Sequence, residues 1–131
     1  MNDIRFKTNE AYDRALNNIR KIVEDNPNPL IHAELETAGL FRALEKVPKT
    51  DALMELFADA AEELGYNRPT GVFLGGCSDA AFVSHMGVPT LCGTGIIGDH
   101  NHTLEEYALE SSILEQAAKI ALTIINLPDD F

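Results

Sequence analysis

The sequence lacks features that whole classes of proteins require. It has no tryptophan, only two cysteines in 131 residues, and no apolar run near the roughly 20 residues that cross a bilayer. Its amino terminus also lacks the basic-then-apolar pattern of a signal peptide. These absences predict a cytoplasmic protein with neither a membrane span nor a disulfide framework.

Basic side chains are scarce as well. Ten Lys and Arg residues face 21 Asp and Glu residues, which gives a formal net charge of -11. Such a chain repels a phosphate backbone, so nucleic acid is excluded as an expected partner. With 45% hydrophobic and 24% charged residues, the composition predicts one or two small globular units.

Hydrophobic periodicity predicts two units with a boundary near Pro48. In residues 1–47 it favours a strand at 3–6, a helix capped by Thr8 or Asn9, and a strand at 30–35. The turn Asn26-Pro27-Asn28-Pro29 separates the helix from the second strand. The first unit therefore has a predicted strand–helix–strand order.

Residues 48–131 show a strand, a glycine turn and helices, which is typical of an α/β fold. We expect a helix capped by Thr50 and ending at Gly65, a strand at 71–74, a helix at 80–85 and a glycine-rich loop at 93–102. Two capping boxes, Thr103 with Glu106 and Ser112 with Glu115, would introduce a terminal helix. Its expected buried face consists of Ile113, Leu114, Ala117, Ile120, Ala121 and Ile124.

The segment Gly75-Gly76-Cys77-Ser78-Asp79 places flexible backbone at a helix start. Free amide groups and the helix dipole attract an anion there, and a carboxylate would suit such a site. An ordinary tight turn explains the same residues. Cys77 is also a weak candidate for a nucleophile, because no histidine and acid partner can be placed beside it.

A second cluster surrounds His100-Asn101-His102, with Asp99 before it and Glu105 and Glu106 after it. Imidazoles and carboxylates suit zinc, although a surface histidine pair with solvated acids explains the cluster equally well, since zinc needs three or four ligands. The letters His-Asn-His also match HNH nucleases, but there the three residues are spread over a ββα element. Arg42 either binds a substrate carboxylate or balances local acids.

Four segments taken together carry a family resemblance: Gly76 to Ala80, Gly87 to Thr90, Gly93 to Gly98 and His102 to Tyr107. In order and spacing they resemble the closing catalytic segment of the zinc metallopeptidase and amidohydrolase family of acetylornithine deacetylase, succinyl-diaminopimelate desuccinylase and glutamate carboxypeptidase. Residues before 48 resemble, more weakly, the second half of the family's ferredoxin-like lid and dimerisation domain. The resemblance thus implies the C-terminal half of an α/β catalytic domain preceded by half a lid.

The same resemblance implies roles for individual residues. His102 would be a terminal ligand of a two-zinc site whose bridging hydroxide attacks an amide carbonyl. Gly76 and Cys77 would offer backbone amides to the substrate carboxylate, with Arg42 as a side-chain partner. The substrate would be a small N-acyl amino acid or peptide.

The other residues of the family's active site have no counterpart here. The remaining metal ligands, the bridging aspartate, the glutamate base and the lid histidine lie earlier in family members. We therefore expect a fragment that binds little or no zinc, is inactive alone and self-associates as a homo-oligomer to cover apolar faces. The alternative is a non-catalytic dimerisation or carboxylate-binding module with the same fold.

Overall fold

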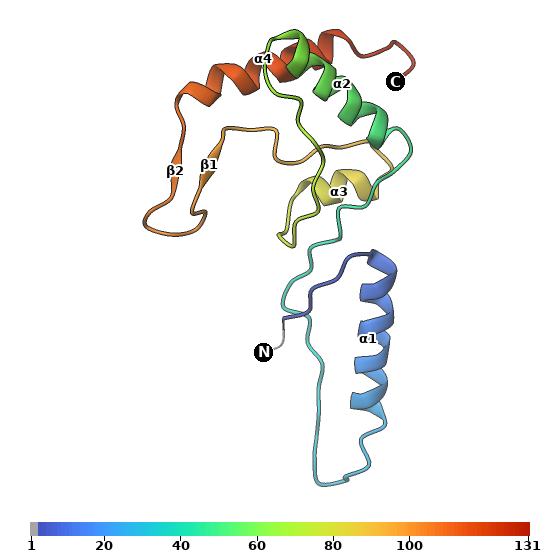
Figure 1. Cartoon of the computed structure of the whole chain (residues 1–131). Helices are drawn as coiled ribbons and strands as arrows, with labels where there is room; N and C mark the ends of the chain where they lie inside the picture. The colour runs from blue at the N-terminus through green and yellow to red at the C-terminus, as the bar shows by residue number, and fades with distance from the viewer. Residues whose placement is uncertain (1–2) are drawn as a thin grey trace. The chain divides into compact units, whose positions relative to one another are not determined.

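Helices dominate the structure, a computed structural model that describes residues 3–131 (Figure 1). They are α1 (Asn9–Glu24), α2 (Thr50–Glu63), α3 (Ala80–His85) and α4 (Ser111–Ile125). Two short strands, β1 (Gly98–Asp99) and β2 (Tyr107–Ala108), pair in antiparallel orientation. Within the described residues, no helix is both long and apolar enough to span a bilayer.

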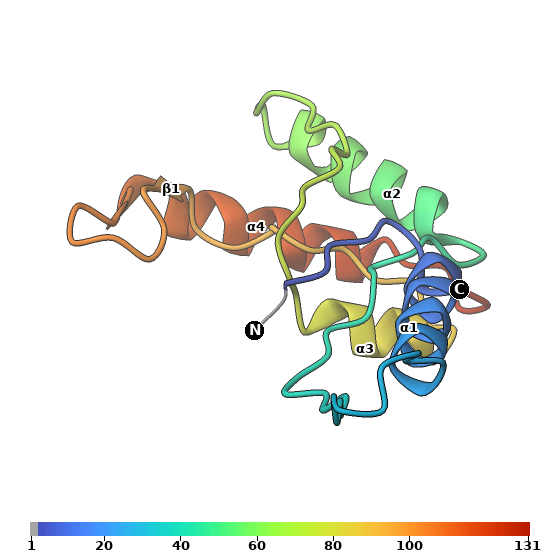
Figure 2. The ribbon, with the colours of Figure 1, turned by 90° about the horizontal axis from the view of Figure 1, so that it is seen from below.

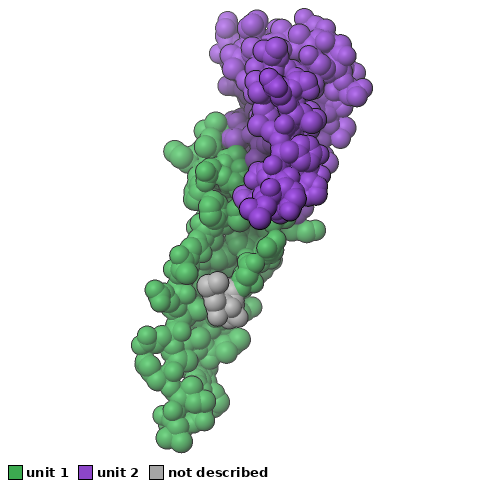
Figure 3. Space-filling view, turned by 90° about the vertical axis from the view of Figure 1, so that its left-hand side faces the viewer, with its two compact units in different colours: residues 1–45, 74–88 green, residues 46–73, 89–131 purple. Residues whose placement is uncertain are grey.

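The chain forms two units, which Figure 3 colours separately. Unit 1 comprises Met1–Glu45 and Leu74–Val88, and unit 2 comprises Lys46–Phe73 and Pro89–Phe131. The chain first passes from unit 1 to unit 2 between Glu45 and Lys46, and Lys46 lies two residues before the predicted boundary at Pro48. Residues 74–88, which the sequence assigned to the second unit, are part of unit 1.

In unit 1, α1 begins where the sequence predicted. Thr8 is its N-cap, because the Thr8 hydroxyl accepts a hydrogen bond from the Ala11 amide at 3.1 Å. Tyr12 is buried at 8% exposure, and its ring lies 4.9 Å from that of Phe6. With Thr8 as the cap, the Asn9 side chain is free to bind elsewhere.

The predicted strands at 3–6, 30–35 and 71–74 do not form within residues 3–131. A strand needs a neighbour to pair its backbone groups, and the described chain supplies none for these segments. Leu30 and Val72 stay 92% and 74% exposed. The helix of the predicted strand–helix–strand unit is confirmed, whereas the ferredoxin-like lid stays a prediction.

In unit 2, α2 packs against α4 (Figures 1 and 2). Phe57, Ala60 and Ala61 are buried as predicted, and the small alanines allow the helices to approach closely. Gly65 follows α2 with a φ of 81°, as its C-terminal position predicted. The cap prediction was wrong: Lys49 is the N-cap residue, and the Thr50 hydroxyl accepts from the Val47 amide instead.

The face of α4 predicted to be buried is exposed. Ser112, Lys119 and Thr123 are buried instead, while Leu114 and Ile124 are 80% and 61% exposed. The buried polar groups have partners: Lys119 pairs with Glu115 and lies over the ring of Tyr66 at 4.8 Å, and the Thr123 hydroxyl donates to the Lys119 carbonyl. The apolar stripe of α4 is therefore uncovered in the described chain.

Neither predicted capping box forms. Thr103 lies in the β1–β2 loop, and the residue before α4 is Glu110. The Ser112 hydroxyl donates to the Leu109 carbonyl at 2.6 Å. It also accepts from the Ile97 amide at 2.9 Å, so it joins the hairpin to the helix.

Candidate functional site

His102 lies in the loop of a β-hairpin in unit 2. Gly98 pairs with Ala108 and Asp99 with Tyr107 to form its base. A Cβ at Gly98 would lie 2.2 Å from the Tyr107 carbonyl oxygen, so only glycine fits there. The predicted glycine-rich loop at 93–102 is therefore partly strand, and the glycine permits close strand pairing.

A turn within the hairpin loop holds His102. The His100 carbonyl accepts hydrogen bonds from the amide and hydroxyl of Thr103, at 3.1 and 2.7 Å. The His102 amide donates to the Glu106 carboxylate at 3.3 Å. The Thr103 hydroxyl and the Glu106 carboxylate, the two groups of the expected capping box, therefore make other bonds within this loop.

Both histidines of the loop adopt left-handed backbone conformations. The φ angles are 59° at His100 and 66° at His102. A residue with a Cβ atom, such as histidine, is strained in this region, and such strain concentrates at functional sites. The His102 side chain is exposed, while the His100 ring lies 6.0 Å from that of Tyr107.

The described residues do not complete a metal site. Nowhere in residues 3–131 do three or more His, Cys, Asp or Glu side chains gather closely enough to hold an ion. A protein zinc site needs three or four ligands, and His102 offers one imidazole. The donor set therefore does not fit a zinc ion without further ligands.

The hairpin is anchored to α4 through Ser112, which is 2% exposed. The Ser112 hydroxyl binds both Ile97 and Leu109. In addition, the Leu109 amide donates a hydrogen bond to the Ile97 carbonyl at 2.8 Å. These bonds extend the β1–β2 pairing by one step. The position of the His102 loop therefore depends on the first turn of α4.

Gly76 and Cys77 lie in unit 1, just before α3, and both are exposed. The Ser78 hydroxyl accepts from the Ala80 amide at 3.2 Å, and the Ser78 carbonyl accepts from the Ala81 amide. Ser78 therefore occupies the first free amides of α3. With only six residues, α3 has a small dipole, so Gly76 and Cys77 would act on an anion through their own amide groups.

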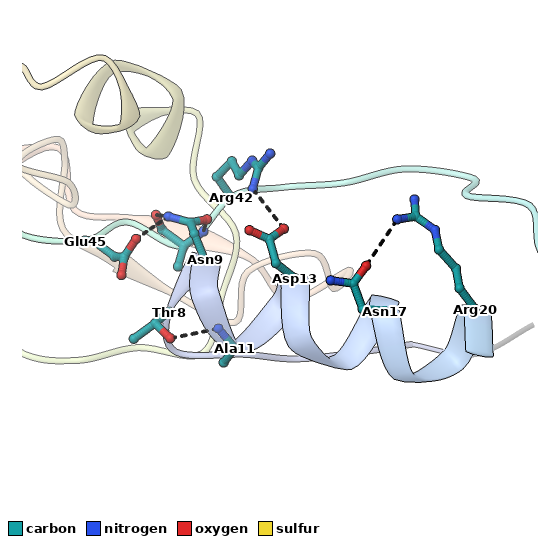
Figure 4. Close-up of polar contacts among 9 residues, drawn as sticks. Thr8, Asn9, Ala11, Asp13, Asn17, Arg20, Arg42 and Glu45 are labelled. Carbon is teal, nitrogen blue, oxygen red and sulfur yellow. Dashed lines mark hydrogen bonds and ion pairs between the residues drawn. The ribbon is translucent and has the colours of Figure 1, made fainter. Parts of the chain in front are cut away.

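Arg42 also lies in unit 1, and Figure 4 shows its surroundings. Its guanidinium is 5.9 Å from the centre of the Tyr12 ring and 3.8 Å from the Asp13 carboxylate. The Arg42 side chain is 28% exposed. The pair with Asp13 agrees with the expectation that Arg42 balances a local acid, whereas its binding of a substrate carboxylate stays a prediction.

The segment that carries Arg42 is joined to α3, the helix that follows Gly76 and Cys77. The rings of Phe41 and Phe82 are 5.8 Å apart, and the Ser84 hydroxyl donates to the Glu45 carbonyl. Unit 1 thus combines the three residues predicted to bind a carboxylate. His102 belongs to unit 2.

Arg68 is the charged residue with the most ion pairs in the described chain. It binds Glu55, Asp59 and Glu62, three carboxylates on α2. Hydrogen bonds with Asp59 and Glu62 raise the pKa of Arg68 above its ordinary value, so the guanidinium stays charged. These ion pairs join the segment after α2 to that helix.

Sequence reasoning missed Asn9, which it treated only as an alternative cap. The Asn9 side chain accepts from the Ala43 amide at 3.0 Å and donates to the Ala43 carbonyl and the Glu45 carboxylate. The adjacent pair Thr8-Asn9 was the available signal. Only one of two neighbouring residues can cap a helix, which leaves the other for a distant partner.

Comparison with known proteins identifies a family. The sequence model of peptidase family M20/M25/M40 matches residues 11–126. No curated protein and no solved structure matches the chain. The matched range spans both units and includes Arg42, Gly76, Cys77 and His102.

Proposed function

Because this chain belongs to peptidase family M20/M25/M40, we propose that it is the carboxy-terminal portion of a zinc-dependent amidohydrolase. Membership places the chain among the hydrolases and metallopeptidases. The reaction we propose for the whole enzyme is hydrolysis of an amide bond in an N-acyl amino acid or a peptide. The family match is the observation that carries this proposal.

In this proposal, unit 2 supplies one metal ligand, His102. Its strained backbone and its exposed side chain support a role in binding rather than in folding. When bound, zinc would polarise the amide carbonyl and lower the pKa of its water. Because one imidazole is too few, the remaining ligands must come from outside these residues, and the chain alone does not turn over substrate.

Unit 1 would bind the substrate's free carboxylate. The amides of Gly76 and Cys77 and the guanidinium of Arg42 are the proposed donors. Two observations support this assignment: the segment that carries Arg42 packs against α3, and Gly76 and Cys77 are exposed. The Cys77 thiol has no role in this scheme.

A second candidate is a carboxylate-binding module without catalysis. The arrangement of Arg42 on Tyr12 is consistent with it, because that arrangement is formed within unit 1 without any metal ligand. Both candidates predict carboxylate binding by Arg42. They differ in whether His102 ever takes part in hydrolysis.

Turnover assays test the inactivity of the isolated chain. The purified 131-residue protein is incubated with zinc and a panel of N-acyl amino acids, and free amine is measured. We expect no turnover above the zinc-only background. Activity that vanishes on His102→Ala would overturn the proposal that this chain is inactive alone.

Complementation separates the two candidates. The chain is co-expressed with a polypeptide that carries the other metal ligands of an M20/M25/M40 peptidase. An enzyme fragment should restore amidase activity, and His102→Ala should abolish it while His32→Ala, on an exposed extended segment of unit 1, should not. A soluble complex without activity would favour the non-catalytic module.

A further inference from the structure

We propose that Asn9 is a positioning residue that holds Arg42 in place for a carboxylate ligand; this inference rests on the role proposed for Arg42 above. Asn9 is separated from its partners by more than 30 residues of sequence, yet it makes three contacts with them. None of these contacts is needed to start α1, because Thr8 already caps it.

The side-chain amide of Asn9 imitates a paired strand. Its oxygen accepts from the Ala43 amide at 3.0 Å and its nitrogen donates to the Ala43 carbonyl at 3.4 Å. A backbone neighbour in a sheet would satisfy the same two groups. Segment 41–45 forms no strand and has no strand beside it among residues 3–131, so Asn9 satisfies backbone groups that a neighbouring strand would otherwise pair.

The contacts of Asn9 hold the chain directly after Arg42. Ala43 follows Arg42 directly, and the Glu45 carboxylate also accepts from the Asn9 amide. From the same helix, the Asp13 carboxylate pairs with the Arg42 guanidinium (Figure 4). The guanidinium also lies over the Tyr12 ring. Asn9 lies about one helical turn from Tyr12 and Asp13, so the backbone and the side chain of Arg42 are held by one face of α1.

Pre-organisation is the physical reason why this matters for binding. An arginine side chain loses much rotamer freedom when it binds a ligand, and an ordered segment reduces that cost. Tyr12 and Asp13 orient the guanidinium only while the backbone at 42 stays near α1. Loss of the Asn9 clamp should therefore weaken carboxylate binding without removing any atom that touches the ligand.

Amide exchange tests the clamp in the ligand-free protein. The full chain is labelled with 15N, and Asn9→Ala is compared with Asn17→Ala, an exposed asparagine on the same helix. We expect Asn9→Ala to speed exchange of the Ala43 amide by about tenfold, the equivalent of one lost hydrogen bond. Unchanged exchange would overturn the inference whatever the ligand data show.

Ligand titration then tests positioning. N-acetylglycine is the probe, and its amide derivative, which lacks the carboxylate, is the control. Asn9→Ala should raise the dissociation constant about fivefold or more, and Arg42→Ala at least as much as Asn9→Ala. A purely structural role would lower the melting temperature and leave the dissociation constant unchanged.

The outcomes distinguish this inference from the proposed function. If Arg42→Ala weakens binding and Asn9→Ala does not, the positioning role of Asn9 is refuted. If Arg42→Ala leaves binding unchanged, or the parent chain does not bind N-acetylglycine, the carboxylate-binding role of Arg42 fails. In that case the Ala43 exchange rate still decides whether Asn9 holds the segment.

Discussion

Replacement of Ser112 by alanine should destabilise unit 2 by about 1–3 kcal/mol, because it leaves a partly buried amide without a partner. Ser112 is 2% exposed, and its hydroxyl accepts a hydrogen bond from the Ile97 amide at 2.9 Å. The Leu109 carbonyl loses one donor but keeps the Ser112 amide at 3.0 Å. The unpaired Ile97 amide therefore accounts for most of the expected loss.

Urea denaturation measures this effect, with Ser111→Ala as the matched control. Ser111 is the first residue of α4 and is exposed. Both substitutions bring the same gain in helix propensity. The difference between the two variants in the free energy of unfolding therefore reports the hydrogen bonds of Ser112. Exchange of the Ile97 amide should accelerate in Ser112→Ala alone.

A difference below about 0.5 kcal/mol between the two variants would refute the reasoning, because ordinary surface substitutions fall within that range. It would mean that water reaches the Ile97 amide and that α4 does not anchor the hairpin. The position of the His102 loop would then need another explanation.

Three further outcomes are expected. His102→Gly should be more stable than His102→Ala by about 1 kcal/mol in urea denaturation, because only glycine adopts the left-handed conformation without strain; equal stability would show that the loop relaxes. Arg68→Met should lower the melting temperature less at high salt than at low salt, since salt screens its exposed partners; a loss independent of salt would contradict ion pairing. Leu114→Lys combined with Ile124→Lys should reduce self-association in light scattering, whereas a parent chain that stays monomeric at high concentration would rule out association through α4.

Local signals in the sequence predicted the helices well. The Thr8 cap, the apolar spacing after it and Gly65 at the end of α2 all lie where they were expected. Helix 80–85 matches its prediction residue for residue. These features depend on neighbours within one or two turns, which is why one sequence is enough to find them.

Features that depend on distant partners were not predicted. The segments at 30–35 and 71–74 have strand-like composition, but pairing decides whether a strand forms, and the described chain offers them no neighbour. The apolar stripe of α4 predicted burial, yet the helix packs through Ser112, Lys119 and Thr123. Periodicity shows which residues share a face and not which face meets a partner.

In the candidate site, too, local motifs could be predicted from the sequence, whereas contacts between distant segments could not. Motif order marked Gly76, Cys77 and His102 as a group, and the structure places the first two in unit 1 and the third in unit 2. The contacts made by Asn9 next to Arg42, and by Glu106 and Ser112 in and below the His102 loop, join residues through loops that the sequence pattern does not describe. Their roles in binding stay proposals.

Zinc content of the purified chain is the most direct test of the central claim, that these residues contribute one ligand to a metal site they do not complete. The protein is prepared without chelators, exchanged into metal-free buffer and analysed by mass spectrometry of the metal. We predict far less than one zinc ion per chain, with no change on His102→Ala. One tightly held zinc ion per chain, lost in His102→Ala, would contradict the claim.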